Sequence, residues 1–298
     1  MIDAARLSRM AYMEENQVMA LFAAAHGHAE VGADTDTEVL QVLKRVTSPP
    51  TFLNDIRSDA QGYGLQYSSD STGPITMLVF RGTSALADAF ADASVRMVPL
   101  KGAASDVLVH RGFQHQFSAL KAQSVRYLST IYELQPLEQH KQGFVCGAPV
   151  LVAGHSLGSA VAAICAMVLS LDYGPGVSYI GFGTPRVGNK PWADLYKETV
   201  QSAVRVKNGR DPVDSCIPPV VYRHIGAKVH VGVRDPYPDI CLLTDLEDHD
   251  MAKYISKLQK DDSAEHPFDV LPYLFGFLSN APVATLNLLK SLTSSAAL

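Results

Sequence analysis

A serine stands between two glycines in the pentapeptide Gly-His-Ser-Leu-Gly at 154–158. An apolar run at 149–153 precedes the pentapeptide, and small residues at 159–163 follow it. This is the G-x-S-x-G pattern in the strand, turn and helix context that it requires, where the glycines leave room for a sharp turn. Such a turn pushes the serine hydroxyl outward, so we interpret Ser156 as a candidate nucleophile for acyl transfer.

A serine hydroxyl becomes a good nucleophile only when a base, usually histidine, removes its proton. In hydrolases with this turn the chain order is serine, acid, histidine, which leaves the four histidines after Ser156: His224, His230, His249 and His266. His224 and His230 flank or occupy a predicted strand, and a structural role explains them better. His249 lies in a polar turn before a helical pattern, so we favour it over His266.

The third group must be an acid that follows a strand and can hold the histidine in one tautomer. Asp211 meets this condition, because it follows the predicted strand 204–207 and a turn, and Pro212 restricts its backbone. Asp214 is the nearest competitor and Asp194 a weaker one. An ordinary surface turn is the alternative explanation for any aspartate in such a loop.

An oxyanion hole needs backbone N–H groups directed at the negative charge that develops on the substrate. Leu157, the residue after the candidate nucleophile, supplies one such group. The segment Phe-Arg-Gly-Thr at 80–83 ends the apolar run 75–80 and is a candidate for the second. A strand that simply ends at a glycine explains this segment equally well.

The elements around these residues alternate between strands and helices, which predicts an α/β fold with a mostly parallel central sheet flanked by helices. The predicted strands are 63–67, 75–80, 150–153, 177–182, 204–207 and 228–231, and the predicted helices are 4–21, 36–45, 114–132 and 157–171. The first two helices form a helical cover over about residues 1–50. No repeat or low-complexity linker interrupts the 298 residues, so we expect a single domain spanning 1–298.

Composition excludes several classes of protein. Hydrophobic residues make up 47% and charged residues 18% of the chain, as in packed globular proteins. A net charge of -5 without a basic run argues against a nucleic-acid partner. Residues 1–30 carry charges that interrupt any signal-peptide core, so a cytoplasmic location is expected rather than secretion. The apolar stretch 268–289 contains two prolines and predicts a packed or interfacial helix rather than a membrane span.

The four cysteines form no C-x-x-C pair, which argues against a zinc cluster or a redox dithiol. We expect most of them to be buried thiols. Cys216 and Cys241 could form a disulfide in an exported protein, whereas an intracellular chain would keep both reduced.

Taken together, the sequence resembles the class 3 lipase family. The similar blocks occur in family order and are 80–83, 109–113, 154–158, 182–189, 211–213 and 249–254. The resemblance implies the α/β-hydrolase fold, the catalytic triad Ser156, Asp211 and His249, and Thr83 with Leu157 as the oxyanion pair. It also implies a lid region at about 84–100, no metal and no organic cofactor.

The implied activity is that of a serine ester hydrolase acting on acylglycerols or related lipids, with a lipid or small ester as substrate and transient contact with a lipid interface. A phospholipase A1 and an acyltransferase are alternatives on the same scaffold, and a non-catalytic binding protein is a third. Two departures from the family stand out. Ala89 occupies a lid position where relatives often have tryptophan, and Asp214 replaces a common proline. Acyl chain length, head group and oligomeric state are not predicted.

Overall fold

The fold is built around a seven-stranded sheet. The computed structural model describes residues 1–30, 32, 35–69, 73–83, 96–132, 149–174, 176–232 and 246–261. In spatial order the strands of the sheet are β1 (Thr51–Asp55), β2 (Ala60–Ser69), β3 (Gly73–Phe80), β6 (Val150–His155), β7 (Val177–Phe182), β8 (Ser202–Asn208) and β9 (Ala227–Val231). A separate two-stranded ribbon pairs β4 (Met97–Pro99) with β5 (Leu108–His110).

The sheet is antiparallel at one end and parallel over the rest. Strands β1, β2 and β3 pair antiparallel, and β3, β6, β7, β8 and β9 pair parallel in that order. Because parallel strands all end at the same edge, the loops that follow them meet there, and ligand sites of open α/β sheets form at that edge. This arrangement confirms the predicted fold class.

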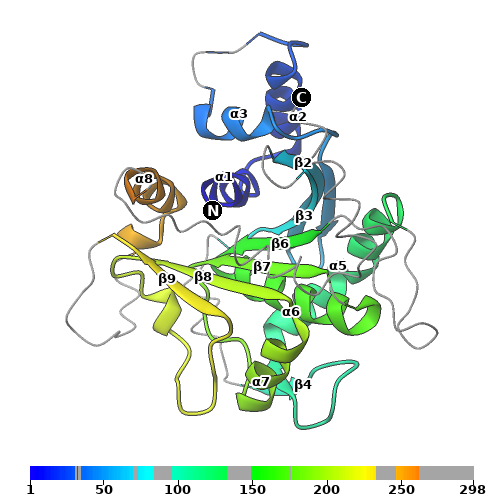
Figure 1. The fold of residues 1–298 in the computed structure, drawn as a ribbon, viewed down its shortest axis with the longest axis vertical. Coiled ribbons are helices and arrows are strands. Elements are labelled where there is room, and N and C mark those ends of the chain that lie inside the picture. Colours follow the sequence, from blue (N-terminus) through cyan, green and yellow to red (C-terminus); the bar gives the residue numbers. More distant parts are fainter. Residues whose placement is uncertain are drawn as a thin grey trace, which may run out of the picture.

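Helices cover both faces of the sheet (Figure 1). One face carries α1 (Ile2–Met10), α2 (Glu15–Ala25), α3 (Thr37–Leu43) and α8 (Met251–Asp261). The other face carries α5 (Arg111–Ser129), α6 (Leu157–Tyr173) and α7 (Lys190–Thr199). The first and last described helices of the chain lie side by side, since α1 packs against α8.

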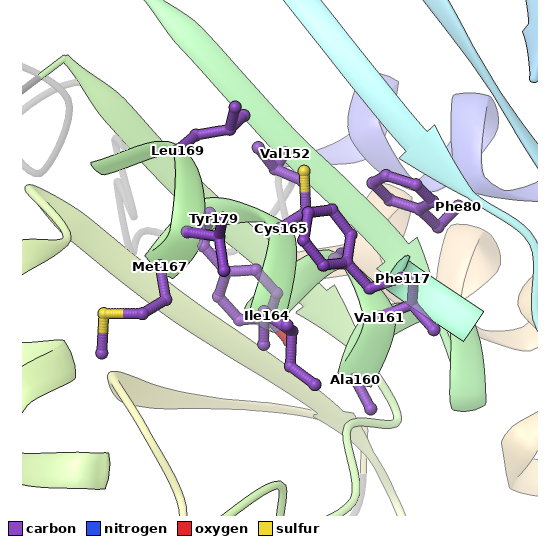
Figure 2. Close-up of a cluster of buried hydrophobic side chains, with 14 of the residues drawn as sticks. Phe80, Phe117, Val152, Ala160, Val161, Ile164, Cys165, Met167, Leu169 and Tyr179 are labelled. Atoms are coloured by element: carbon purple, nitrogen blue, oxygen red, sulfur yellow. The ribbon is translucent and has the colours of Figure 1, made fainter. Parts of the chain in front are cut away.

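Helix α6 forms the centre of one core. Every residue from Leu157 to Ser170 is buried, so this helix has no polar face, as expected for a helix enclosed on all sides. Figure 2 shows its side chains between Phe117 of α5 and the strand residues Val152 and Tyr179. The buried helix holds the turn before it in a fixed place, and that turn contains Ser156.

Several local predictions were wrong. Residues 4–21 do not form one helix, because α1 ends at Met10 and α2 begins at Glu15. Glu14 and Gln17 form a capping box that starts the second helix, and the chain turns between the two. Strands β1, β4 and β5 and helix α7 were not predicted.

Some predictions lie wholly or largely outside the described residues. These are most of the lid region, at 84–95, and the apolar stretch 268–289. Within the described ranges, no helix is long and apolar enough to span a membrane. The same ranges hold no group of three acidic, histidine or cysteine side chains that could bind a metal ion.

The cysteines only partly match the prediction of buried thiols. Cys165 is a buried free thiol. Cys216 is disulfide-bonded, the alternative that the sequence left open for it. Cys146 and Cys241 lie outside the described residues, and the pairing of Cys216 with Cys241 stays a prediction.

Candidate active site

Ser156 lies in the sharp turn between β6 and α6. Its backbone has φ 59° and ψ −132°, a left-handed conformation that costs energy for a residue with a side chain. Its N–H donates to the carbonyl of Phe182 over 2.8 Å, which ties the turn to β7. A Cβ atom at Gly158 would lie 2.4 Å from the Phe80 carbonyl oxygen, so only glycine lets α6 approach the end of β3 this closely.

His249 is held by Asp211, as the sequence predicts. His249 ends the short 3-10 helix η2 (Glu247–His249) and is buried. Its Nδ1 lies 2.8 Å from Oδ2 of Asp211. Because the carboxylate accepts, Nδ1 carries a proton, which makes Nε2 the nitrogen that can act as a base.

Asp211 is fully buried and accepts two further hydrogen bonds. The hydroxyl of Tyr254 in α8 donates to Oδ2 over 2.5 Å, and the N–H of Val213 donates to Oδ1 over 2.9 Å. Burial raises the pKa of Tyr254 well above 10, so its phenol keeps the proton that it donates. The carboxylate is therefore fixed in position from three sides.

The two remaining groups of the predicted triad are both buried, and neither has a hydrogen-bond partner among the described residues, the other group included. These are the Ser156 hydroxyl and Nε2 of His249. The rings of His155 and His249 stack with centroids 4.4 Å apart, so the imidazole lies next to the residue that precedes the serine. Since Ser156 has no exposed surface, a substrate can reach its hydroxyl only after the atoms that cover it move.

The predicted oxyanion residues belong to two segments next to Ser156, the start of α6 and the loop after β3. Leu157 is the first residue of α6, where backbone N–H groups have no partner within the helix and the helix dipole favours negative charge. Thr83 follows Gly82, where an added Cβ would lie 3.1 Å from the Cβ of Ser156. The loop after β3 thus passes directly beside the serine.

The competing acids lie elsewhere. Asp214 is buried, but its Oδ1 lies 2.6 Å from the Arg205 guanidinium, so it is neither solvated nor directed at His249. Asp194 is exposed and pairs with Lys190 on α7. Among these acids, only Asp211 contacts the candidate base.

The competing histidines are also explained by their positions. His224 lies 3.6 Å from Asp214, and burial lowers its pKa far below 6.5, so it stays neutral. His230 belongs to β9. His266 is outside the described residues. The choice of His249 therefore agrees with its contact to Asp211.

The sequence predicts no role for Tyr254, although this residue lies in the segment 249–254 that resembles the lipase family. The tyrosine is five residues after His249, on the buried side of α8 with Ile255 and Leu258. A tyrosine in an otherwise aliphatic helix face is the signal that could have indicated a buried hydrogen bond.

The chain is similar in sequence to known lipases and phospholipases. The family described as "Lipase (class 3)" matches residues 77–221. The chain is 31% identical to a lipase of Rhizomucor miehei over 186 residues, which is 60% of this chain and 47% of the relative. It is 28% identical to phospholipase A1-II 1 of rice (Oryza sativa subsp. indica) over 179 residues, or 54% and 44% of the two chains. The chain thus spans about half the length of these curated relatives.

The solved structures support the fold. The triacylglyceride lipase of Rhizomucor miehei superposes with a TM-score of 0.54 at 21% identity, covering 77% of this chain and 78% of that one. The family match contains Thr83, Ser156 and Asp211 and ends before His249, which the structure brings into contact with Asp211. Residues 77–221 of this chain match the class 3 lipase family, and the chain has the α/β-hydrolase fold.

Proposed function

We propose that this protein is a serine ester hydrolase that cleaves carboxylic esters of acylglycerols or related lipids. The observation that carries the proposal is the buried Asp211–His249 pair: its imidazole lies against His155, the residue before Ser156, and Nε2 and the Ser156 hydroxyl are both buried without a partner among the described residues. A serine held in a left-handed turn before a helix is a further support, since such strain is typical of functional positions.

In the first half-reaction, Nε2 of His249 removes the proton of Ser156 as its Oγ bonds to the ester carbonyl carbon. Asp211 stabilises the imidazolium that forms. The tetrahedral intermediate then breaks its bond to the alcohol oxygen, and His249 returns the proton to that leaving group. The products are an acyl-Ser156 and a free alcohol.

In the second half-reaction, His249 removes a proton from water, whose oxygen attacks the acyl carbon. The bond to Ser156 Oγ breaks, the serine recovers its proton from His249, and the carboxylic acid leaves. In both steps the N–H groups of Thr83 and Leu157 donate to the oxyanion. The chemistry needs no metal and no organic cofactor.

The proposal is tested by replacing Ser156 with alanine and measuring nitrophenol release from acyl nitrophenyl esters. Turnover should fall to the background rate. Ser129→Ala is a matched control, because Ser129 is an exposed serine whose hydroxyl donates only to the Val125 carbonyl of its own helix. Unchanged turnover in pure Ser156→Ala would exclude the proposed mechanism.

The substrate class has two candidates. The lipase relative favours acylglycerols, and the rice relative, a phospholipase A1, favours phospholipids. Rates on acylglycerols of graded chain length and on a diacyl phospholipid should separate them. A rise in rate above the solubility limit of one ester would support contact with a lipid interface. Ester formation exceeding hydrolysis in the presence of an added alcohol would instead indicate an acyltransferase.

A further inference from the structure

Tyr12 contacts two parts of the candidate site, the end of β6 and the loop after β3. It belongs to the short turn between α1 and α2, far in sequence from the triad (Figure 1). The mechanism proposed above uses neither Tyr12 nor His155, the residue before Ser156. Their contacts form one continuous chain of hydrogen bonds.

The first link joins His155 to the backbone of the base. Nε2 of His155 lies 2.8 Å from the carbonyl oxygen of His249. A carbonyl can only accept, so Nε2 carries a proton. Burial lowers the pKa of His155 well below 6.5, which leaves the ring neutral and its Nδ1 an acceptor.

The second link joins His155 to Tyr12. The Tyr12 hydroxyl lies 2.7 Å from Nδ1 of His155. Because Nδ1 is the acceptor, the tyrosine must donate. Burial raises the pKa of Tyr12 above its ordinary value of 10, so the phenol keeps its proton over the working range of an enzyme.

The third link joins Tyr12 to the loop after β3. The backbone of Gly82 lowers the pKa of Tyr12, as an N–H directed at the phenol oxygen would. A Cβ at Gly82 would lie 2.3 Å from that oxygen. The Arg81 guanidinium lies 5.9 Å from the centre of the Tyr12 ring, within the range of a cation–π contact.

We propose that Tyr12 is a positioning residue that fixes the backbone of His249 through His155 and the backbone of Gly82 directly, and thereby sets the base and the oxyanion loop relative to Ser156. The inference rests on the proposed function. Tyr12 lies between α1 and α2, and its hydroxyl contacts both His155 and Gly82.

The test is Tyr12→Phe, which removes the hydroxyl and keeps the ring. We expect kcat for a soluble nitrophenyl ester to fall about tenfold or more, the size expected for one hydrogen bond, with KM changed by less than about twofold. The rate of Ser156 labelling by a fluorophosphonate should fall in parallel, because this probe reports the reactivity of the serine.

Tyr63→Phe is the matched control. The Tyr63 hydroxyl is also buried and donates to the Leu7 carbonyl of α1, without contact to the candidate site. Its loss should lower the melting temperature and leave kcat and the labelling rate unchanged. Equal losses of kcat in both variants would reduce Tyr12 to a general structural role and overturn the inference.

A second pair of variants tests the path through His155. His155→Gln keeps a donor near the position of Nε2, whereas the shorter side chain of His155→Asn cannot reach the His249 carbonyl. The kcat of the glutamine variant should be several times that of the asparagine variant. In the double variant, adding Tyr12→Phe to His155→Asn should lower kcat by a smaller factor than Tyr12→Phe does alone. If the losses of kcat from the two single variants simply multiply in the double variant, Tyr12 does not act through His155.

These outcomes are distinct from failure of the proposed function. If Ser156→Ala retains activity, the hydrolase mechanism itself is wrong. If Ser156→Ala is inactive while Tyr12→Phe keeps the parental kcat and labelling rate, only the positioning role is wrong.

Discussion

Two buried carboxylates lie three residues apart in the loop after β8 and have opposite surroundings. Asp211 lies against an imidazole, a phenol and a backbone amide. Asp214 lies against the guanidinium of Arg205 at 2.6 Å, with the side chains of His224 and Lys228 at 3.6 Å.

The difference separates the parts that these acids can take. A buried carboxylate beside a permanent cation has its charge already compensated, and such a pair mainly ties elements together. A buried carboxylate held by hydrogen bonds keeps its charge available for a proton that arrives on the imidazole. Closeness in sequence to the triad therefore does not show which acid takes part in the chemistry. The group that each carboxylate contacts shows it.

The largest effect is expected for Asp211→Asn. The amide keeps the shape but can no longer stabilise the imidazolium or fix its tautomer, so kcat should fall by roughly 10³–10⁴. Steady-state kinetics on a nitrophenyl ester measures the loss, and circular dichroism checks the fold. A decrease of only a few-fold would place Asp211 in the same class as Asp214.

Asp214→Asn should instead reduce stability. It leaves the buried charge of Arg205 without compensation, and breaking such pairs costs about 3–5 kcal/mol. Urea unfolding measures the change, and active-site titration with a fluorophosphonate gives kcat per folded molecule, which should stay within about threefold. A large loss of kcat at full occupancy would show that Asp214 also acts on His249.

Tyr254→Phe removes one of the hydrogen bonds that hold Asp211. Since hydrogen bonds to charged groups contribute about 1.5–3 kcal/mol, we expect kcat to fall about tenfold, together with a modest loss of stability. Tyr196→Phe is the control, because its buried hydroxyl has no partner among the described residues. Similar kinetics in the two variants would remove Tyr254 from the support of the triad.

Low pH should destabilise the fold, because protonation of the buried His224 beside Asp214 favours the unfolded chain. Burial lowers the pKa of His224 in the folded chain, with nearby arginines acting in the same direction, while the unfolded chain binds a proton near 6.5. Stability is therefore full above about pH 6.5 and falls below it, by up to about 1.4 kcal/mol per pH unit for one histidine. His224→Gln should flatten the dependence of the unfolding free energy on pH by that amount; an unchanged slope contradicts it.

The smallest effect is expected for Lys228→Gln. The lysine side chain is 37% exposed and its Nζ lies 3.6 Å from Asp214. Partly exposed ion pairs contribute less than about 1 kcal/mol, so the unfolding free energy should change by no more than this. A loss as large as that of Asp214→Asn would mean that Lys228, and not Arg205 alone, compensates the buried carboxylate.

The sequence predicted the elements with the strongest patterns. The apolar runs at β6, β7 and β8 are long enough to identify buried parallel strands, and the order of serine, acid and histidine along the chain limited the candidates for the triad. Strands β4 and β5 are three residues each and carry too little periodicity to be found. The Asn189 cap of α7 was a signal that could have been used.

The supporting residues could not be predicted in the same way. Tyr12 and His155 are 143 positions apart, and their contact depends on how α1 packs on the sheet. Nothing local distinguishes Tyr12 from the other tyrosines. Likewise, Asp211 and Asp214 have similar sequence surroundings, and only the packing of Arg205 behind one of them separates their functions.

The left-handed backbone of Ser156 has a consequence for how such a chain evolves. Glycine adopts this conformation freely, so Ser156→Gly should relieve about 1–3 kcal/mol of strain while abolishing nucleophilic chemistry. If stability alone were selected, glycine would therefore be favoured at position 156, and the protein would be inactive. The serine at this position therefore carries a cost in stability that the proposed chemistry requires.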